Sequence, residues 1–246
     1  MAFFGGDSML KYGIMKNNLA IILAGGTGTR IKGDVPKQFL MLQGKTVMQH
    51  TIEKFENHPL IRHIFFVTNA EYYRQTEEVV RNCGFLKVVK ILEGGIHRQD
   101  SSRIGVLATA SSQYENVLIH DAARPFVSKK IIDDVLDRLE TYSAVNVAVP
   151  SPDTVIEIDD NQLIKKVPDR NYLRRVQTPQ AFKLELIQKA HRLALENNIT
   201  NATDDCSLVL DLNLAPVYVV EGSQMNIKIT YPFDLQVAQK ILEMQK

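Results

Sequence analysis

The sequence predicts an α/β protein with a mostly parallel sheet, helices on both faces and one projecting β-hairpin. Short apolar runs rich in Val, Ile and Leu alternate with amphipathic stretches along the chain. This alternation is typical of buried parallel strands joined by crossover helices. Residues 153–168 interrupt it with two strand-like runs around a polar turn, which predicts the hairpin.

The strands are predicted from apolar runs that are bounded by turn residues. They cover residues 18–24, 61–68, 86–92, 116–120, 145–150 and 215–222. Because most of these runs are apolar throughout and do not alternate with polar residues, both faces of the sheet are expected to be covered.

The helices are predicted from apolar residues that recur at helical spacing. The segment 128–142 places Ile131, Val135 and Leu139 on one stripe, and Ser128 precedes them as an N-cap. The same pattern recurs in residues 183–198, 47–57, 71–83 and 232–244. A further helix start is expected in "NATDDCSLVL", with Thr203 or Asp204 as its cap.

The chain from residue 18 to 246 is predicted to form one domain, with an arm over approximately residues 151–180. Residues 1–17 have neither a cationic start nor a continuous apolar stretch, so they do not resemble a secretory signal. We expect a disordered lead or a remnant of expression there.

Composition excludes several classes of protein. The 246-residue chain has a net charge of +1, which argues against a general binder of nucleic acid or membrane surfaces. No apolar run approaches the roughly 18 residues of a membrane span. Cys83 and Cys206 form no C-x-x-C pair, so neither a disulfide framework nor a zinc site is expected, and a reducing cytoplasm is the predicted compartment.

A glycine-rich segment, "LAGGTGTRIKGDVPKQFL", follows the first predicted strand, where open α/β sheets bind ligands. Three glycines precede three cations in it: Gly25, Gly26, Gly28, Arg30, Lys32 and Lys37. The dinucleotide pattern G-x-G-x-x-G fails at Ile31, and no Walker G-K-[ST] follows. The segment is either a backbone cradle for an anion, with cations that neutralise phosphate charge, or a tight turn before a solvated basic loop.

The segment "HDAARPF" carries residues suited to phosphate chemistry. Asp121 directly follows the apolar run of a predicted strand and is well placed to hold a divalent cation that bridges phosphates. Arg124, three residues later, is suited to a bidentate grip on a second anion. A structural Asp–Arg pair is the alternative interpretation.

Three further segments are informative only in combination. "GGIHRQDS" is a second glycine turn with Ser101 as a helix cap, and "MNIKIT" places Lys228 on a short strand. "DRNYLRRVQTPQAF" carries Arg170, Arg174 and Arg175, which form either a solvated face or a contribution to a neighbouring active site. The histidines show no metal-ligand spacing and no G-x-S-x-G elbow is present.

Taken in order, these segments resemble the sugar-alcohol-phosphate cytidylyltransferases. The matching motifs are "AGGTGTR…PKQFL", "GG..RQDS", "HDAARP", "DT" at 153–154, "R…QTPQAF" and "NIKIT…DL", and they run from residue 19 to about 240. The resemblance implies a Rossmann-like nucleotidyltransferase domain whose β-arm makes a homodimer. It also implies transfer of CMP from CTP to a polyol phosphate, with Mg²⁺ as the cation and pyrophosphate as the product.

The resemblance further implies roles for the residues at matching positions. Those expected to bind CTP are Ala24, Gly25, Gly26, Gly28, Gly95 and Ser101. The catalytic cations around the triphosphate are expected to be Arg30, Lys37 and Lys228. Those expected to line the polyol-phosphate pocket, the arm residues entering from the partner subunit, are Asp121, Arg124, Thr154, Arg170 and Thr178. Asp121 is also the expected Mg²⁺ ligand.

Members of this family act on 2-C-methyl-D-erythritol 4-phosphate, for isoprenoid precursors, or on ribitol 5-phosphate, for CDP-ribitol. "HDAARP" resembles the methylerythritol branch, which we favour because that pathway is the commoner need in bacteria. Val155 and Arg174, however, stand where that branch commonly has Lys and Trp, and "DDCSLVL" and "AVNVAVP" are closer to the ribitol branch. Two other classes are considered: a non-catalytic nucleotide-binding homologue, against which the retained cations argue, and a dinucleotide-dependent oxidoreductase, which the failed glycine pattern disfavours.

Overall fold

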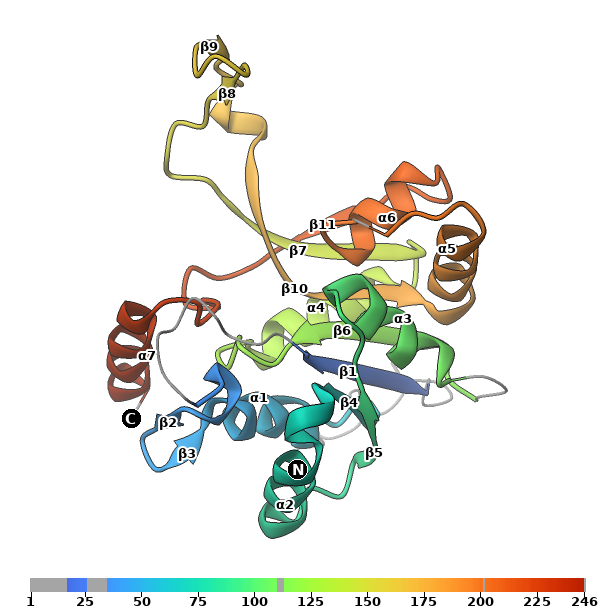
Figure 1. Cartoon of the computed structure of the whole chain (residues 1–246), viewed down its shortest axis with the longest axis vertical. Coiled ribbons are helices and arrows are strands. Elements are labelled where there is room, and N and C mark those ends of the chain that lie inside the picture. Colours follow the sequence, from blue (N-terminus) through green and yellow to red (C-terminus); the bar gives the residue numbers. More distant parts are fainter. Residues whose placement is uncertain (1–16, 26–34, 110–112, 201, 246) are drawn as a thin grey trace, which may run out of the picture.

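The computed structural model describes residues 17–25, 35–109, 113–200 and 202–245, so the expected lead lies almost wholly outside the described residues. Within the described residues, seven strands form one sheet in the order β11-β7-β10-β6-β1-β4-β5 (Figure 1). They are β1 (Asn18–Ala24), β4 (Ile61–Thr68), β5 (Val88–Glu93), β6 (Asn116–Asp121), β7 (Ala144–Pro150), β10 (Arg174–Lys183) and β11 (Tyr218–Glu221). All neighbours are parallel except β10, which is antiparallel to β6 and β7. The predicted, mostly parallel α/β sheet is confirmed.

Strand β10 is not predicted by the sequence pattern. It begins with two arginines and contains Pro179, and a proline without a backbone N–H disfavours a central strand. The structure accommodates the proline by a register shift in the pairing with β7 between Gln177 and Ala181. Residues 177–182 are buried, so the last part of the segment expected to form the arm belongs to the sheet.

Alternate residues of the buried strands face two different cores. In β1, Ala20 and Ile22 belong to one core, and Ile21 and Leu23 to the other. The first core is covered by α1 (Val47–Glu56), α2 (Tyr73–Cys83) and α4 (Lys129–Arg138). The second is covered by α3 (Arg98–Leu107), α5 (Leu184–Glu196) and α6 (Asp205–Asp211). Helices therefore lie on both faces of the sheet, as predicted.

Two local predictions near the sheet edge need correction. Helix α3 begins at Arg98, so Ser101 lies in its first turn and does not cap it. Residues 225–230, with Lys228, form a loop that starts in a turn, and not a strand. In contrast, the predicted cap of α6 is confirmed, because the Asp204 carboxylate accepts the Ser207 N–H at 2.7 Å.

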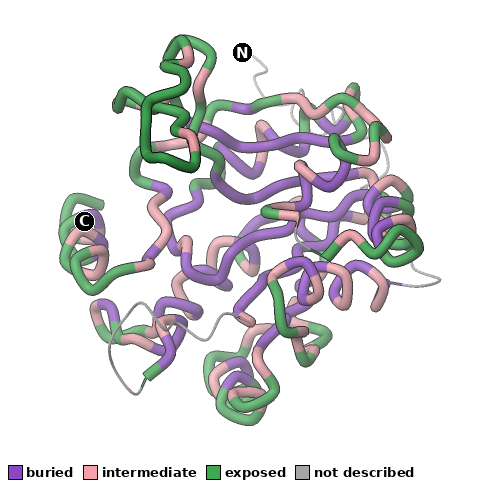
Figure 2. Tube along the Cα trace, turned by 45° about the horizontal axis from the view of Figure 1, so that its top comes forward, coloured by how far each residue is buried: buried purple, intermediate pink, exposed green. Residues whose placement is uncertain are grey.

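The predicted hairpin at residues 153–168 is confirmed. It consists of β8 (Glu157–Ile158) and β9 (Ile164–Lys166), which pair antiparallel. The Asp159 carboxylate stabilises the turn by accepting the N–H groups of Asn161 and Leu163. The hairpin projects from the sheet (Figure 1) and is exposed along most of its length (Figure 2).

The remaining elements flank the sheet. They are η1 (Lys37–Phe39), β2 (Met41–Leu42), β3 (Lys45–Thr46), η2 (Ala70–Tyr72), η3 (Arg170–Tyr172) and α7 (Pro232–Met244). Helix α7 packs Ala238 and Ile241 against Leu42 and Val47 in a smaller core. Across the residues that the structure describes, every helix falls short of the length and apolar character needed to cross a bilayer.

Candidate active site

A pocket of about 280 Å³ opens at the carboxyl ends of β1 and β6. This is the edge of an open parallel sheet at which ligands bind. Its wall is formed by Leu23, Ala24, Gly25, Lys37, Gln38, Ile96, His97, Arg98, Ser101, Asp121, Ala122, Ala123 and Lys228. Residues from the start, middle and end of the chain therefore meet in one place.

Asp121, the last residue of β6, is the charged centre of this wall. One carboxylate oxygen lies 2.7 Å from Lys228 Nζ, and the other lies 3.5 Å from Arg98 Nε. Burial alone raises the pKa of the Asp121 carboxyl, but Arg98, Lys228 and Arg124 outweigh it and hold this pKa well below its ordinary value. The carboxylate is therefore ionised across the physiological range.

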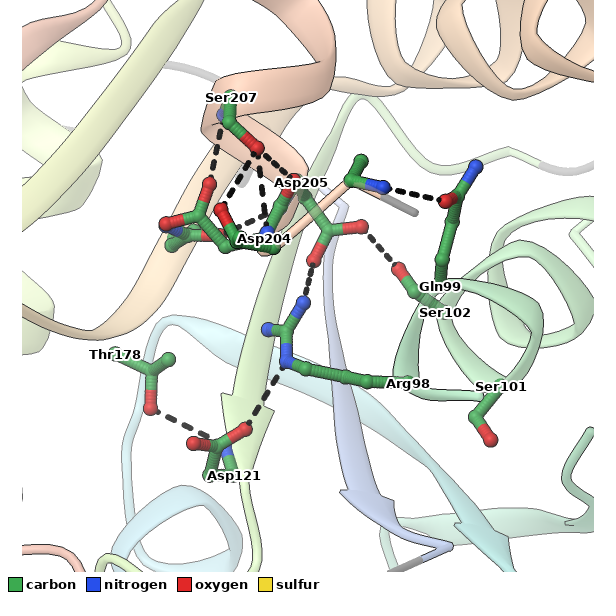
Figure 3. Close-up of polar contacts among 12 residues, drawn as sticks. Arg98, Gln99, Ser101, Ser102, Asp121, Thr178, Asp204, Asp205 and Ser207 are labelled. Atoms are coloured by element: carbon green, nitrogen blue, oxygen red, sulfur yellow. Dashed lines mark hydrogen bonds and ion pairs between the residues drawn. The ribbon is translucent and has the colours of Figure 1, made fainter. Parts of the chain in front are cut away.

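Arg98 links Asp121 to a second buried carboxylate, that of Asp205 in α6. The Arg98 guanidinium lies between the two carboxylates (Figure 3), with Nη1 2.8 Å from Asp205 Oδ2. Burial disfavours the charged guanidinium, but Asp205 and Asp121 more than compensate and raise the pKa of Arg98. Neither residue is among the predicted site residues, although Arg98 is the "R" of the "GG..RQDS" motif.

A chain of hydrogen bonds behind Asp121 sets the tautomer of His120. His120 Nε2 lies 3.0 Å from the carbonyl oxygen of Arg124, which only accepts, so Nε2 carries the proton. Burial lowers the pKa of His120 to about 4, and the neutral ring therefore accepts at Nδ1 from the Thr178 hydroxyl at 3.0 Å. Thr178 Oγ1 in turn accepts the backbone N–H of Asp121 at 3.1 Å. Thr178 thus supports the strand end.

Arg124 is not among the residues of the pocket wall and holds the loop that carries Lys228. Its Nη1 donates to the carbonyl oxygen of Asn226 at 2.8 Å, and its Nη2 donates to that of Val176 at 3.4 Å. Asn226 is buried and its side-chain amide donates to the carbonyl oxygen of Thr178 at 3.0 Å. The loop is therefore tied to β10 from two sides.

Glycines make room for Ser101 at the pocket wall. A Cβ added at Gly25 would lie 2.8 Å from Ser101 Oγ, and one at Gly94 would lie 2.7 Å from the same atom. A Cβ at Gly95 would lie 2.2 Å from the Asp100 Cβ. The two glycine turns that the sequence singles out therefore bring β1 and the start of α3 into direct contact.

The structure brings some of the predicted site residues together and separates others. The pocket wall includes Ala24, Gly25, Lys37, Ser101, Asp121 and Lys228. Gly95 lies in the adjoining loop, and Arg124 and Thr178 lie behind Asp121. Thr154 and Arg170 are exposed on the arm and do not line this pocket. Gly26, Gly28 and Arg30 lie outside the described residues.

The side chains at the pocket could supply only part of the ligands that a metal ion needs. Among the described residues there is no group of three or more His, Cys, Asp or Glu side chains that could hold one. Asp121 offers a single carboxylate at the pocket wall. That fits Mg²⁺, which commonly binds through one or two carboxylates together with substrate phosphates and water.

The comparisons with known proteins identify the family. Residues 18–244 match the family model of 2-C-methyl-D-erythritol 4-phosphate cytidylyltransferase. The chain belongs to this family. It is therefore a cytidylyltransferase, and the resemblance seen in the sequence motifs is confirmed.

Several relatives support this assignment. The 2-C-methyl-D-erythritol 4-phosphate cytidylyltransferase of Thermobifida fusca is 39% identical and covers 91% of this chain and 92% of its own length. The bifunctional ribulose 5-phosphate reductase/CDP-ribitol pyrophosphorylase Bcs1 of Haemophilus influenzae is 40% identical over 92% of this chain, but the chain spans only 48% of that protein. The crystal structure of 4-diphosphocytidyl-2C-methyl-D-erythritol synthase from Anaerococcus prevotii matches with a TM-score of 0.82 and 30% identity, covering 93% of this chain and 99% of that one.

Proposed function

We propose that this chain transfers CMP from CTP to the phosphate of a five-carbon polyol phosphate, 2-C-methyl-D-erythritol 4-phosphate, and releases pyrophosphate. The observation that carries the proposal is the meeting of Lys37 and Lys228 at one pocket, beside the Gly25–Ser101 contact. Two lysines from opposite ends of the chain suit a polyphosphate ligand. The wall of Gly25 and Ser101 is proposed to receive the nucleoside.

The reaction needs no general base, because the substrate phosphate is already anionic at neutral pH. A phosphate oxygen attacks the α-phosphorus of CTP, a new P–O bond forms, and the α–β bridge breaks with its electron pair on pyrophosphate. Two anions have to approach each other, so positioning and fixed positive charge carry the catalysis. Lys37, Lys228 and, from the sequence motif, Arg30 are proposed to supply that charge.

Asp121 is proposed as the protein residue that would hold a Mg²⁺ ion at the pocket wall. When bound there, the ion would supply positive charge beside the phosphates. Lys228 already pairs with one Asp121 oxygen. We therefore propose that Lys228 and the metal share this carboxylate.

Ribitol 5-phosphate is the second candidate substrate, and a specific observation favours it. The relative from Haemophilus influenzae, whose name includes CDP-ribitol pyrophosphorylase, is as similar to this chain as the methylerythritol relatives are. Val155 and Arg174, which depart from the methylerythritol pattern, lie at the two ends of the projecting arm. Both polyols have five carbons, in a branched chain for methylerythritol and a straight chain for ribitol, and both carry a primary phosphate, so they demand the same chemistry.

The deciding experiment measures pyrophosphate release with CTP and Mg²⁺, comparing the two polyol phosphates at equal concentrations. A kcat/KM at least about tenfold higher for 2-C-methyl-D-erythritol 4-phosphate, equivalent to about 1.4 kcal/mol, supports the primary proposal. The reverse preference replaces it with ribitol 5-phosphate. Tight CTP binding without turnover of either polyol would favour the non-catalytic homologue.

We also propose that the arm joins two copies of the chain into a homodimer in the cytoplasm. Apolar side chains stand exposed along it: Val155, Ile156, Ile158, Leu163, Ile164, Val167 and Tyr172. A patch of this kind marks an interaction surface. In the dimer, Thr154 and Arg170 of one copy would approach the polyol pocket of the other.

A further inference from the structure

Arg98 joins two buried carboxylates from different elements, and the proposed chemistry does not use it. Its Nε lies 3.5 Å from Asp121 Oδ1, and its Nη1 lies 2.8 Å from Asp205 Oδ2 (Figure 3). Asp121 holds Lys228 through its other oxygen, at 2.7 Å. We propose that Arg98, anchored on Asp205, is a positioning residue that fixes the Asp121 carboxylate and, through it, the Lys228 ammonium. This inference rests on the proposed function, because it assigns a role within the same site.

Asp205 has the contacts of a fixed anchor. Its side chain is 2% exposed, and its carboxylate accepts the Ser102 hydroxyl and lies 3.4 Å from His191 Nε2. Its backbone N–H donates to Gln180 Oε1 at 3.0 Å. Neighbours from α3 and α5 therefore hold the carboxylate, and Gln180 of β10 holds the backbone, so Arg98 has a fixed partner.

Thr178 holds the backbone N–H of Asp121, but among the described residues the Asp121 carboxylate has no neutral hydrogen-bond donor comparable to Ser102 at Asp205. Its carboxylate lies at the wall of an open pocket, and the partners of its two oxygens are the cations Arg98, Lys228 and, at 3.8 Å, Arg124. A lysine tail is flexible and an ammonium is a point charge, so Lys228 cannot set the angle of the carboxylate. The planar guanidinium of Arg98 presents donors in fixed directions and can do so.

The test replaces the guanidinium fork by a point charge in Arg98→Lys. Arg103→Lys is the matched control, because Arg103 lies on the same helix, its side chain is 27% exposed against 26% for Arg98, and it pairs with Asp100 away from the pocket. We expect Arg98→Lys to lower kcat by about 10- to 100-fold, the scale of a misplacement of about 1 Å, with the KM for CTP within about threefold of wild type. Arg103→Lys is expected to stay within about twofold in both constants.

Asp205→Asn extends the test without touching the pocket wall. It removes the anchoring charge but keeps the shape of the side chain, so kcat is expected to fall, as it does in Arg98→Lys. Because both substitutions act through one contact, the double variant with Arg98→Lys is expected to be about as slow as Arg98→Lys alone. Losses in kcat that multiply independently would overturn the proposal.

Crystal structures of the variants give a readout that does not depend on activity. The contact of 2.7 Å between Asp121 and Lys228 is expected to persist in Arg103→Lys and to be lost in Arg98→Lys. An unchanged contact in Arg98→Lys, or a kcat equal to that of the control, would overturn the positioning role. If wild type fails to turn over either polyol phosphate, the proposed function fails, and the crystal comparison alone decides the positioning role. Asp205→Asn provides both measurements if Arg98→Lys does not fold.

Discussion

Gly25 and Gly94 both crowd Ser101, but only one of the two resulting clashes can be relieved by shortening the serine. A Cβ at Gly25 would lie 2.8 Å from Ser101 Oγ, and its next contact is Ser101 Cβ at 3.7 Å. A Cβ at Gly94 would lie 2.7 Å from the same Oγ but also 3.2 Å from the carbonyl oxygen of Thr68. We therefore expect Ser101→Ala to rescue Gly25→Ala and to leave Gly94→Ala destabilised.

The size of the effect follows from what has to move. In Gly25→Ala, the Ser101 hydroxyl is displaced from its contact with the carbonyl oxygen of His97, at 3.3 Å, and overpacking of this kind costs about 1–3 kcal/mol. In the Ser101→Ala background the clash is gone, and Gly25→Ala is expected to be neutral or to stabilise by about 0.4–1 kcal/mol through the unfolded state. The coupling free energy between the two sites is then about 1–3 kcal/mol.

The assay is urea denaturation of wild type, both single variants and the double variant for each glycine, with the m-value checked for constancy. A free energy of unfolding for Gly25→Ala that is lowered equally in both serine backgrounds would refute the packing of Ser101 against Gly25. Equal rescue of Gly94→Ala would show that the Thr68 carbonyl does not limit the space there. Retention of the fold in each variant is read from its circular dichroism.

Three further predictions follow from the site, the arm and a buried histidine. Arg30→Ala and Lys37→Ala are each expected to lose about 100-fold in turnover, or on the order of 3 kcal/mol, while remaining folded; near-normal turnover of either variant would remove its assigned role. Ile164→Asp, on the exposed arm, should convert the dimer to monomer in analytical ultracentrifugation, and a wild type that is already monomeric would contradict the arm proposal. Burial lowers the pKa of His58 from its ordinary 6.5 in spite of nearby Asp133. As the pH falls below about 6.5, the unfolded chain therefore protonates this histidine more readily than the folded chain does, and the free energy of unfolding decreases. His58→Gln should flatten this loss in urea titrations between pH 7 and 5, and an unchanged slope would contradict it.

The elements that the sequence predicts well are those whose signal is local. The run at residues 61–68 coincides with β4, and the pattern at 232–244 coincides with α7. In β4 the signal is a run of apolar residues, and in α7 it is apolar residues at helical spacing, so each is contained in one short segment. The turns in the arm and at Asp204 are equally local, because each depends on one carboxylate that accepts a backbone N–H a few residues away.

Strand β10 and the start of helix α3 could not be predicted from a local sequence pattern. The arginines and Pro179 of β10 argue against a central strand, and burial comes from the neighbouring strands β6 and β7, which are distant in sequence. The start of α3 contains Arg98, Gln99, Ser101 and Ser102, whose polar side chains break the apolar stripe. Arg98 and Ser101 line the pocket, Arg98 and Ser102 bind the Asp205 carboxylate, and Gln99 bonds the backbone of Ile199 and Ala202. These polar contacts hide the helical pattern.

The same reasoning explains why Asp121, Lys37 and Lys228 could be proposed for the site from the sequence, whereas the separate roles of its arginines could not. Spacing shows that a guanidinium lies near a phosphate pocket, but not which acceptors already occupy its donors. Arg124 directs two of its nitrogens to backbone carbonyls of the Lys228 loop and of β10, and Arg98 divides its donors between two carboxylates. Arg124 therefore acts on the pocket through another residue, as we propose for Arg98, and a contribution of this kind is recognised only when the tertiary contacts of the guanidinium are known.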